Sequence, residues 1–226
     1  MNIIVAKIIR VSSVFILSSA AALVYASPYD DAILAFENQD YNTALTLSMP
    51  LANAQDSDAM TLVGRIYDEG FNQSAKAVPW FRKAAELGNA QAQLELAELY
   101  EAGEAVPKDM DMAIKWYEKA AAQEHDEAQL ALAMHYLEDL DEPKEALILL
   151  EKSAKQGNAR AQYQIGLLYL GEPDIPADKL KAWHYFSLAA DSLPEAAQAR
   201  DILQLEMSKT ELAQAAASLA QQKAPR

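Results

Sequence analysis

A helical pattern that recurs four times along the chain restricts the fold more than any other feature of the sequence. Each copy has an alanine, two bulky residues three and four positions later, and a small residue and an alanine seven and eight positions later. These offsets place all five side chains on one face of an α-helix, which we call a B helix. The copies begin at spacings of 36, 33 and 36 residues and consist of Ala77-Trp80-Phe81-Ala84-Ala85, Ala113-Trp116-Tyr117-Ala120-Ala121, Ala146-Leu149-Leu150-Ser153-Ala154 and Ala182-Tyr185-Phe186-Ala189-Ala190.

A second helical pattern precedes each B helix and defines its partner, the A helix. It has an alanine, a large aliphatic residue four positions later, a small residue next to it and a tyrosine three positions further on. The small residue allows two helix axes to approach closely. Because one such pair buries its apolar face only against its neighbours, the patterns predict an all-α, superhelical solenoid of αα-hairpins over residues 57–192. The copies are Ala59-Val63-Gly64-Tyr67, Ala92-Leu96-Ala97-Tyr100, Ala128-Leu132-Ala133-Tyr136 and Ala161-Ile165-Gly166-Tyr169.

The two ends of the predicted solenoid carry degenerate copies of the patterns, as capping units do. Residues 27–56 are predicted to form an N-terminal capping hairpin, in which Pro50 is expected to kink the second helix. Residues 193–221 are predicted to form C-terminal capping helices, the last of which opens with the capping box Ser208-Lys209-Thr210-Glu211. The remaining residues, 222–226, are predicted to be a frayed tail.

Glycines mark the ends of most of these helices. Left-handed C-terminal caps are expected at the glycines after three A helices and two B helices. The third unit departs from this rule, because Glu124 and Asp139 stand where the other units have glycine. The glycines concerned are Gly70, Gly103 and Gly171 after A helices and Gly88 and Gly157 after B helices.

The first 26 residues have the organisation of a secretory signal peptide. Lys7 and Arg10 precede an apolar run, and Val24-Tyr25-Ala26 fits a cleavage site before Ser27. The uncharged stretch, about 15 residues long, is shorter than the roughly 20 that a spanning helix needs, so an uncleaved anchor is the less favoured interpretation. We therefore expect a periplasmic protein with no membrane insertion after cleavage, and secretion is the alternative.

The charge of the chain disfavours two classes of partner. Removing Lys7 and Arg10 from the 19 basic residues leaves 17 against 33 acidic ones, a net charge of −16. Nucleic acid and anionic lipid are repelled by such a protein. The chain also has no cysteine, which excludes disulfides and thiolate metal sites. The mature protein is thus expected to be held together by packing alone.

Residue patterns that carry chemistry are missing from the sequence. The three histidines, His125, His135 and His184, do not have the spacing of a zinc site. Serine-nucleophile signatures and glycine-rich phosphate loops are also missing. We therefore predict no catalytic residue, no metal and no cofactor. The aromatic residues at repeat positions are assigned to the core and not to a sugar-stacking platform.

The second unit carries a family resemblance. The segments Leu99-Tyr100-Glu101-Ala102-Gly103, Val106-Pro107-Lys108-Asp109 and Ala113-Ile114-Lys115-Trp116-Tyr117-Glu118-Lys119-Ala120-Ala121 together resemble a Sel1-like repeat. The resemblance extends over all four units, and the N-terminal hairpin is closer to a tetratricopeptide unit. It implies a right-handed superhelix whose A helices line a concave surface that serves as a scaffold for protein complexes. It implies no reaction.

The concave face can be predicted from the positions that the packing pattern leaves unused. Relative to the small residue of each A helix, positions three before, one after and four after lie near the face turned away from the B helix. These positions are mainly polar or acidic in the first two units and mainly apolar in the last two. In the first two units they include Thr61, Arg65, Asp68, Leu94, Glu98 and Glu101, and in the last two they are Leu130, Met134, Leu137, Tyr163, Leu167 and Leu170.

Three functions remain as hypotheses. The first is a periplasmic adaptor that holds a protein or peptide partner in this groove, in envelope assembly or regulation. The second is a secreted factor that acts on a host cell. The third, least favoured, is an envelope enzyme that acts on peptidoglycan or a β-lactam, because relatives that bind β-lactams are rich in disulfides and this chain has no cysteine. An open question is whether the C-terminal capping helices cover the apolar half of the groove.

Overall fold

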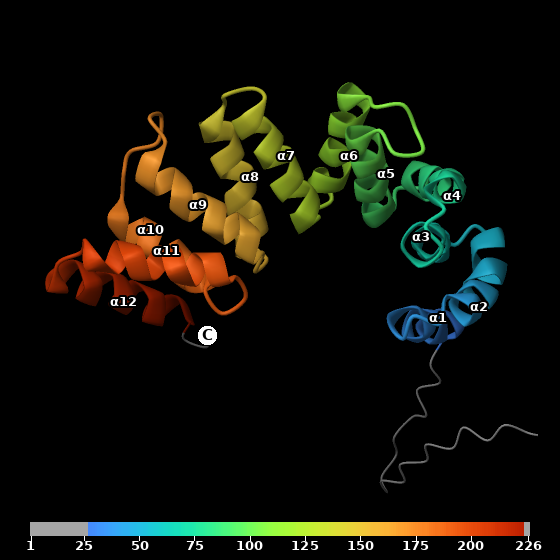
Figure 1. Ribbon diagram of the computed structural model, residues 1–226, viewed down its shortest axis with the longest axis horizontal. Helices are drawn as coiled ribbons and strands as arrows, with labels where there is room; N and C mark the ends of the chain where they lie inside the picture. The colour runs from blue at the N-terminus through green and yellow to red at the C-terminus, as the bar shows by residue number, and fades with distance from the viewer. Residues whose placement is uncertain (1–26, 224–226) are drawn as a thin grey trace, which may run out of the picture.

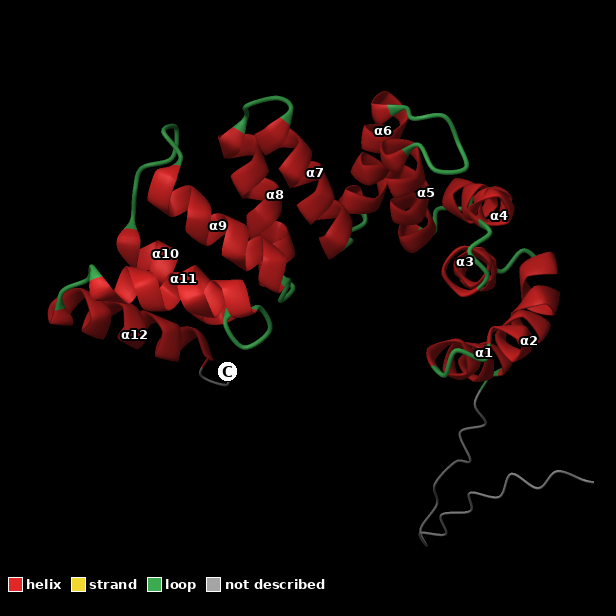
Figure 2. Cartoon of the chain, in the orientation of Figure 1, coloured by secondary structure: helices red, strands yellow, loops and turns green. Residues whose placement is uncertain are grey.

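The computed structural model describes residues 27–223, and this part of the chain is helical throughout, with no strand (Figures 1 and 2). The helices follow one another along an open arc, with α1 and α2 at one end and α11 and α12 at the other (Figure 1). The predicted signal peptide lies outside the described residues. At the other end, α12 continues to Lys223, past residue 222, from which the tail was predicted.

The helices alternate as the repeat predicts. An N-terminal hairpin of α1 (Pro28–Glu37) and α2 (Tyr41–Asn53) precedes four units, and α11 (Pro194–Leu205) and α12 (Lys209–Lys223) follow them. In the first unit, the A helix ends in a π-helical turn, η1 (Ile66–Gly70). The A helices are α3 (Ser57–Arg65), α5 (Ala90–Ala102), α7 (Asp126–Glu138) and α9 (Ala159–Gly171), and the B helices are α4 (Ser74–Glu86), α6 (Met110–Ala122), α8 (Pro143–Lys155) and α10 (Lys179–Ala189).

The small residues of the A helices allow the aromatic rings of the B helices to touch their backbone. An added Cβ at Gly64 would lie 2.5 Å from Cε1 of Phe81, and one at Gly166 would lie 2.4 Å from Cε1 of Phe186. Both phenylalanines are fully buried. The close approach predicted from the repeat is therefore confirmed in the first and fourth units.

The repeated aromatic positions contribute unequally to the core. Trp116 and Tyr117 are 8% and 3% exposed and pack in one cluster with residues from α2 to α7. Trp80, which has the same repeat position as Trp116, is only half-buried and lines a surface pocket with Lys83. For the bulky pair of the B helix, the predicted core role is thus complete in the second unit and partial in the first.

A ladder of buried glutamines joins consecutive units. The side-chain amides of Gln93, Gln129 and Gln162 each donate a hydrogen bond to a backbone carbonyl of the preceding B helix, at 3.1–3.3 Å. Gln123 and Gln156 then donate to the side-chain oxygens of Gln93 and Gln129, at 2.8 and 3.0 Å. Because a buried amide without partners is costly, this ladder fixes how each unit sits on the next.

Only some of the predicted left-handed caps are present. Gly88, Gly103 and Gly157 have φ angles of 96°, 76° and 98°, as expected. Glu124 adopts the same conformation, with φ of 62°, although it carries a side chain. The predictions for the two remaining glycines are wrong. Gly70 closes the π-helical turn, with the Tyr41 ring against it, and Gly171 ends α9 before the extended residue Glu172.

The capping helices do not cover the apolar half of the concave face. Both α11 and α12 pack on α10, and Leu167 and Leu170 on α9 stay 39% exposed. No helix within residues 27–223 has both the length and the apolar character needed to cross a membrane.

Candidate interaction surface

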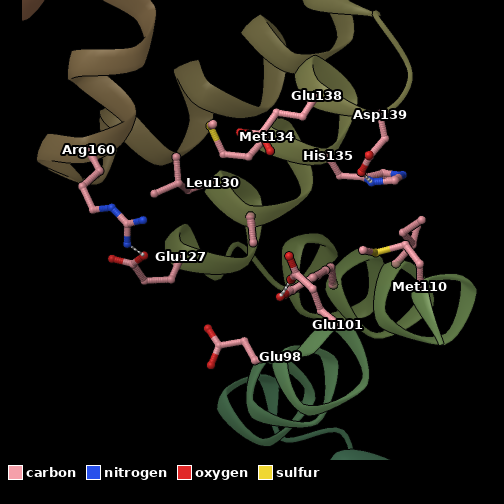
Figure 3. A pocket seen from close by; sticks show the side chains of 13 residues that line it. Glu98, Glu101, Met110, Glu127, Leu130, Met134, His135, Glu138, Asp139 and Arg160 are labelled. Carbon is pink, nitrogen blue, oxygen red and sulfur yellow. Dashed lines mark hydrogen bonds and ion pairs between the residues drawn. The ribbon is translucent and has the colours of Figure 1, made fainter. Parts of the chain in front are cut away.

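A pocket of about 380 Å³ opens at the middle of the solenoid (Figure 3). Side chains from three consecutive A helices, α5, α7 and α9, surround it, and one B helix, α6, contributes to its wall. We call it the central pocket. Its lining consists of Glu98, Glu101, Met110, Ile114, Tyr117, Glu127, Leu130, Ala131, Met134, His135, Glu138, Asp139 and Arg160.

The basic side chains of the central pocket are already engaged with carboxylates. Nη1 of Arg160 lies 3.7 Å from Oε2 of Glu127, and Nδ1 of His135 lies 2.6 Å from Oδ2 of Asp139 (Figure 3). Five carboxylates line the pocket against one arginine and one histidine, so its charge is strongly negative.

The hydroxyl of Tyr117 donates a hydrogen bond to Oε2 of Glu101 at 2.5 Å. Burial raises the pKa of Tyr117, and this hydrogen bond to a carboxylate raises it further. Tyr117 therefore stays protonated and acts as a fixed donor that holds Glu101 in place.

Glu98, like Glu138, has no hydrogen bond or ion pair with the residues that the structure describes. Its side chain is exposed on α5, yet the protein around it displaces part of its hydration. This desolvation raises the pKa of Glu98 to about 7, and the negative charges of Glu95, Glu101 and Glu127 act in the same direction. Arg160 opposes the shift. Near neutral pH the carboxyl is thus only partly ionised.

Towards the N-terminus, the concave face carries an ion-pair network around Arg65, which also lines a small pocket of about 90 Å³. Nε of Arg65 lies 2.7 Å from Oε1 of Glu69 and 3.7 Å from Oε1 of Glu95, and its guanidinium lies 4.8 Å from the ring centroid of Phe36. Arg65 is therefore occupied by contacts within the protein. Burial raises the pKa of Glu95, which lies next to this network.

Towards the C-terminus, the concave face is apolar. Leu167 and Leu170 on α9 are each 39% exposed. The helices α9 and α11 can be aligned by a shift of 35 residues, because the buried Ala161 and Leu168 of α9 then match the buried Ala196 and Leu203 of α11. The same shift matches Leu167 and Leu170 with two exposed residues of α11. We call these four the apolar strip: Leu167, Leu170, Ile202 and Leu205, of which the last two are 55% and 87% exposed.

Two of the three predicted groove positions are open in the structure, and the third is closed. The residues one and four positions after the small residue are exposed or half-buried in every unit. In the third unit these residues are Met134 and Leu137. The position three before it is buried in the first three units, where Thr61, Leu94 and Leu130 are 5%, 5% and 3% exposed. Leu130 thus belongs mainly to the core and forms only the floor of the central pocket.

In the fourth unit, the position three before the small residue is occupied by Tyr163, which is half-buried. Its ring centroid lies 5.6 Å from that of Phe186, so the ring packs on the core of its own hairpin. The sequence analysis placed Tyr163 among the groove residues, and the structure leaves only part of the side chain available there.

Several lining residues were missed by the sequence analysis. Glu127 and Arg160 lie seven positions, or two helical turns, before Met134 and Leu167 and therefore on the same helix face. Extending the predicted face by two turns would have found both. Met110, Ile114 and Tyr117 come from the B helix α6, which had been assigned to packing alone.

The three histidines have separate roles. His125 is the N-cap of α7, where its Nδ1 accepts from the backbone N–H of Ala128 at 3.4 Å, and its Nε2 lies 3.0 Å from Oε1 of Gln91. His135 pairs with Asp139, and Nδ1 of His184 is buried without a hydrogen-bond partner among the described residues. Within residues 27–223, no group of histidines and carboxylates has the arrangement of a metal site.

Fold and surface together define an αα-hairpin solenoid with an open concave face. The Sel1 repeat model matches residues 57–89, 90–125, 126–158 and 159–192, which are the four units of the structure. The chain belongs to the Sel1 repeat family, whose members are generally scaffolds for interactions between proteins. No curated protein matches the sequence.

Solved structures of several repeat proteins are similar to this chain. A Sel1 repeat protein from Oxalobacter formigenes is 32% identical with a TM-score of 0.64, and the match covers 74% of this chain and 72% of that one. A protective antigen of uropathogenic Escherichia coli is 26% identical with a TM-score of 0.53, over 86% of this chain and 52% of that one. This chain therefore spans about half the length of that antigen. A Sel1 repeat protein from Klebsiella pneumoniae, at 20% identity and a TM-score of 0.54, covers 78% of this chain and 91% of its own and shares the fold.

Proposed function

We propose that the protein is an exported interaction scaffold that binds a segment of a partner protein along its concave face. The observation that carries this proposal is the apolar strip. Four apolar side chains remain exposed, two on α9 and two at the equivalent positions of the capping helix α11, and α12 packs on α10. Leaving such side chains in water is unfavourable, and contiguous apolar surface on a protein typically marks a contact site.

The compartment forms part of the proposal. The N-terminal segment supports export, and the periplasm fits a protein without disulfides that is held together by packing. We place the protein there, in envelope assembly or regulation. Mass spectrometry of the purified protein is expected to find Ser27 as the first residue, and fractionation is expected to place the protein with a periplasmic marker. Retention of Met1 would make the segment an anchor, and recovery from the culture medium alone would favour a secreted factor.

Crosslinking tests the concave face directly, because a chain without cysteine accepts single cysteines as unique labels. Leu167→Cys, carrying a photoreactive benzophenone, is expected to form a specific covalent adduct with a protein from the envelope fraction. The matched control is Ile148→Cys on the B helix α8, which replaces another exposed apolar residue, 56% exposed. Equal adducts from both positions, or adducts from Ile148→Cys alone, would contradict binding along the concave face.

A further inference from the structure

The concave face changes character along its length. The central pocket carries five carboxylates, and the apolar strip that follows on α9 and α11 carries none. A partner that covers both must offer positive charge at one end of its contact segment and apolar side chains at the other. Burying apolar area supplies most of the binding free energy, and charge complementarity fixes which segment is accepted and in which direction.

The negative charge of the central pocket is not neutralised from within the protein. Arg160 and His135 are each used by one carboxylate, and Tyr117 serves Glu101. Glu98 is left without an ion pair or hydrogen bond among the described residues, and Glu138 likewise. The lining also includes the apolar side chains of Met110, Ile114 and Met134, which suit the methylene stem of a long cationic side chain.

On the basis of the proposed function, we propose that the partner is a peptide segment in which a lysine or arginine lies next to apolar residues. The cationic group enters the central pocket beside Glu98, and the apolar side chains lie on the apolar strip. A small free cation does not use the strip. A metal ion finds no group of ligands in the described part of the chain.

The electrostatics of Glu98 support this assignment. Its pKa is raised to about 7 because ionisation is disfavoured by desolvation and by Glu95 and Glu101 on its own helix and Glu127 on α7. A bound cation favours the ionised form, lowers the pKa of Glu98 and so releases a proton on binding. The free protein holds more protons than the complex near pH 6, and affinity therefore increases as pH rises through 7.

Selection from random twelve-residue peptides displayed on phage tests the class of partner. Peptides recovered on the mature protein are expected to be enriched in lysine or arginine beside leucine, isoleucine or phenylalanine. Recovery on the double variant Leu167→Gln/Leu170→Gln, at two partly exposed positions that should tolerate the change, is expected to lose the apolar preference. Peptides that need these leucines but show no basic enrichment would overturn this inference and leave the proposed function standing. Failure to recover any peptide that depends on the concave face would contradict both.

Affinity of one recovered peptide, measured by fluorescence polarisation, tests the role of Glu98. Glu98→Gln is expected to weaken binding by about tenfold at pH 8. Between pH 6 and pH 8 the affinity of the unmodified protein is expected to increase by up to about tenfold, and Glu98→Gln is expected to remove most of this dependence. His135 pairs with Asp139 in the same pocket, and the pH dependence that remains in Glu98→Gln measures what groups other than Glu98 contribute.

Two controls complete the experiment. Glu118→Gln removes the same charge from an exposed position of α6 outside the central pocket and is expected to leave affinity unchanged. If Glu118→Gln and Glu98→Gln lowered the affinity equally, the effect would come from the net charge of the protein, and the assignment of Glu98 would be overturned. Spermidine, a free polyamine, is expected to bind far more weakly than the peptide. Equally tight binding of spermidine would make the pocket a small-cation site.

Discussion

Replacement of Trp116 by alanine is expected to lower the free energy of unfolding by about 3–5 kcal/mol, the range for loss of a large buried aromatic ring. The side chain is 8% exposed and packs in the cluster that joins α2 to α7. Nζ of Lys119 lies 3.8 Å from its ring centroid, so the substitution also removes a cation–π contact. Urea unfolding followed by circular dichroism at 222 nm measures the loss.

Two variants serve as matched controls for Trp116→Ala. Trp116→Phe keeps most of the volume and removes an indole N–H that has no partner in the described structure, so a loss below about 1.5 kcal/mol is expected. Trp80→Ala makes the same substitution at the same repeat position, where the ring is only half-buried, and is expected to cost less than Trp116→Ala. A loss below about 1 kcal/mol for Trp116→Ala would show that the ring does not fill an inter-unit layer.

Replacement of Gly166 by alanine is expected to cost about 1–3 kcal/mol, although alanine is the better helix former. The added Cβ would lie 2.4 Å from Cε1 and 2.6 Å from Cδ1 of Phe186, a ring that is itself fully buried. One of the two helices must move, and Tyr163 packs on the same ring. The same unfolding experiment measures this loss.

Gly171→Ala provides the control within the same helix. An added Cβ there meets no atom within 4 Å, so the variant is expected to be neutral or more stable by up to about 1 kcal/mol. Phe186→Leu is expected to offset part of the cost of Gly166→Ala, since the third unit combines Ala133 with Leu150 at these two positions. Strictly additive losses in the double variant would contradict a direct clash between residues 166 and 186.

The fold was predictable because its packing is periodic. In the first and fourth units, the repeat places a phenylalanine, Phe81 or Phe186, on the inner face of the B helix. It also places a glycine, Gly64 or Gly166, at the matching position of the A helix. The contact between the two residues can therefore be predicted from their spacing in the sequence. The failures occur where the chain leaves the period. The π-helical turn that ends at Gly70 has no sequence signal of this kind, and Glu124 adopts a conformation that its side chain disfavours.

The candidate surface was less predictable because it is made by more than one helix. A helical wheel of a single A helix places Leu94 and Leu130 on its free face, whereas in the solenoid the neighbouring units bury that position. The contribution of Met110 and Tyr117 depends on how α6 meets α7, which the repeat pattern does not encode. Glu98 is exposed in the structure, as its position on a single A helix predicts.

The glutamine ladder has a consequence for how such a gene changes over generations. Each interior unit carries a glutamine donor near the start of its A helix and an acceptor carbonyl near the end of its B helix, as the second unit does with Gln93 and Ala121. An in-frame duplication or deletion of a whole unit therefore recreates a joint that already fits. The length of the concave face can therefore change by whole units under selection. An insertion or deletion of a few residues within a unit, by contrast, breaks the joint.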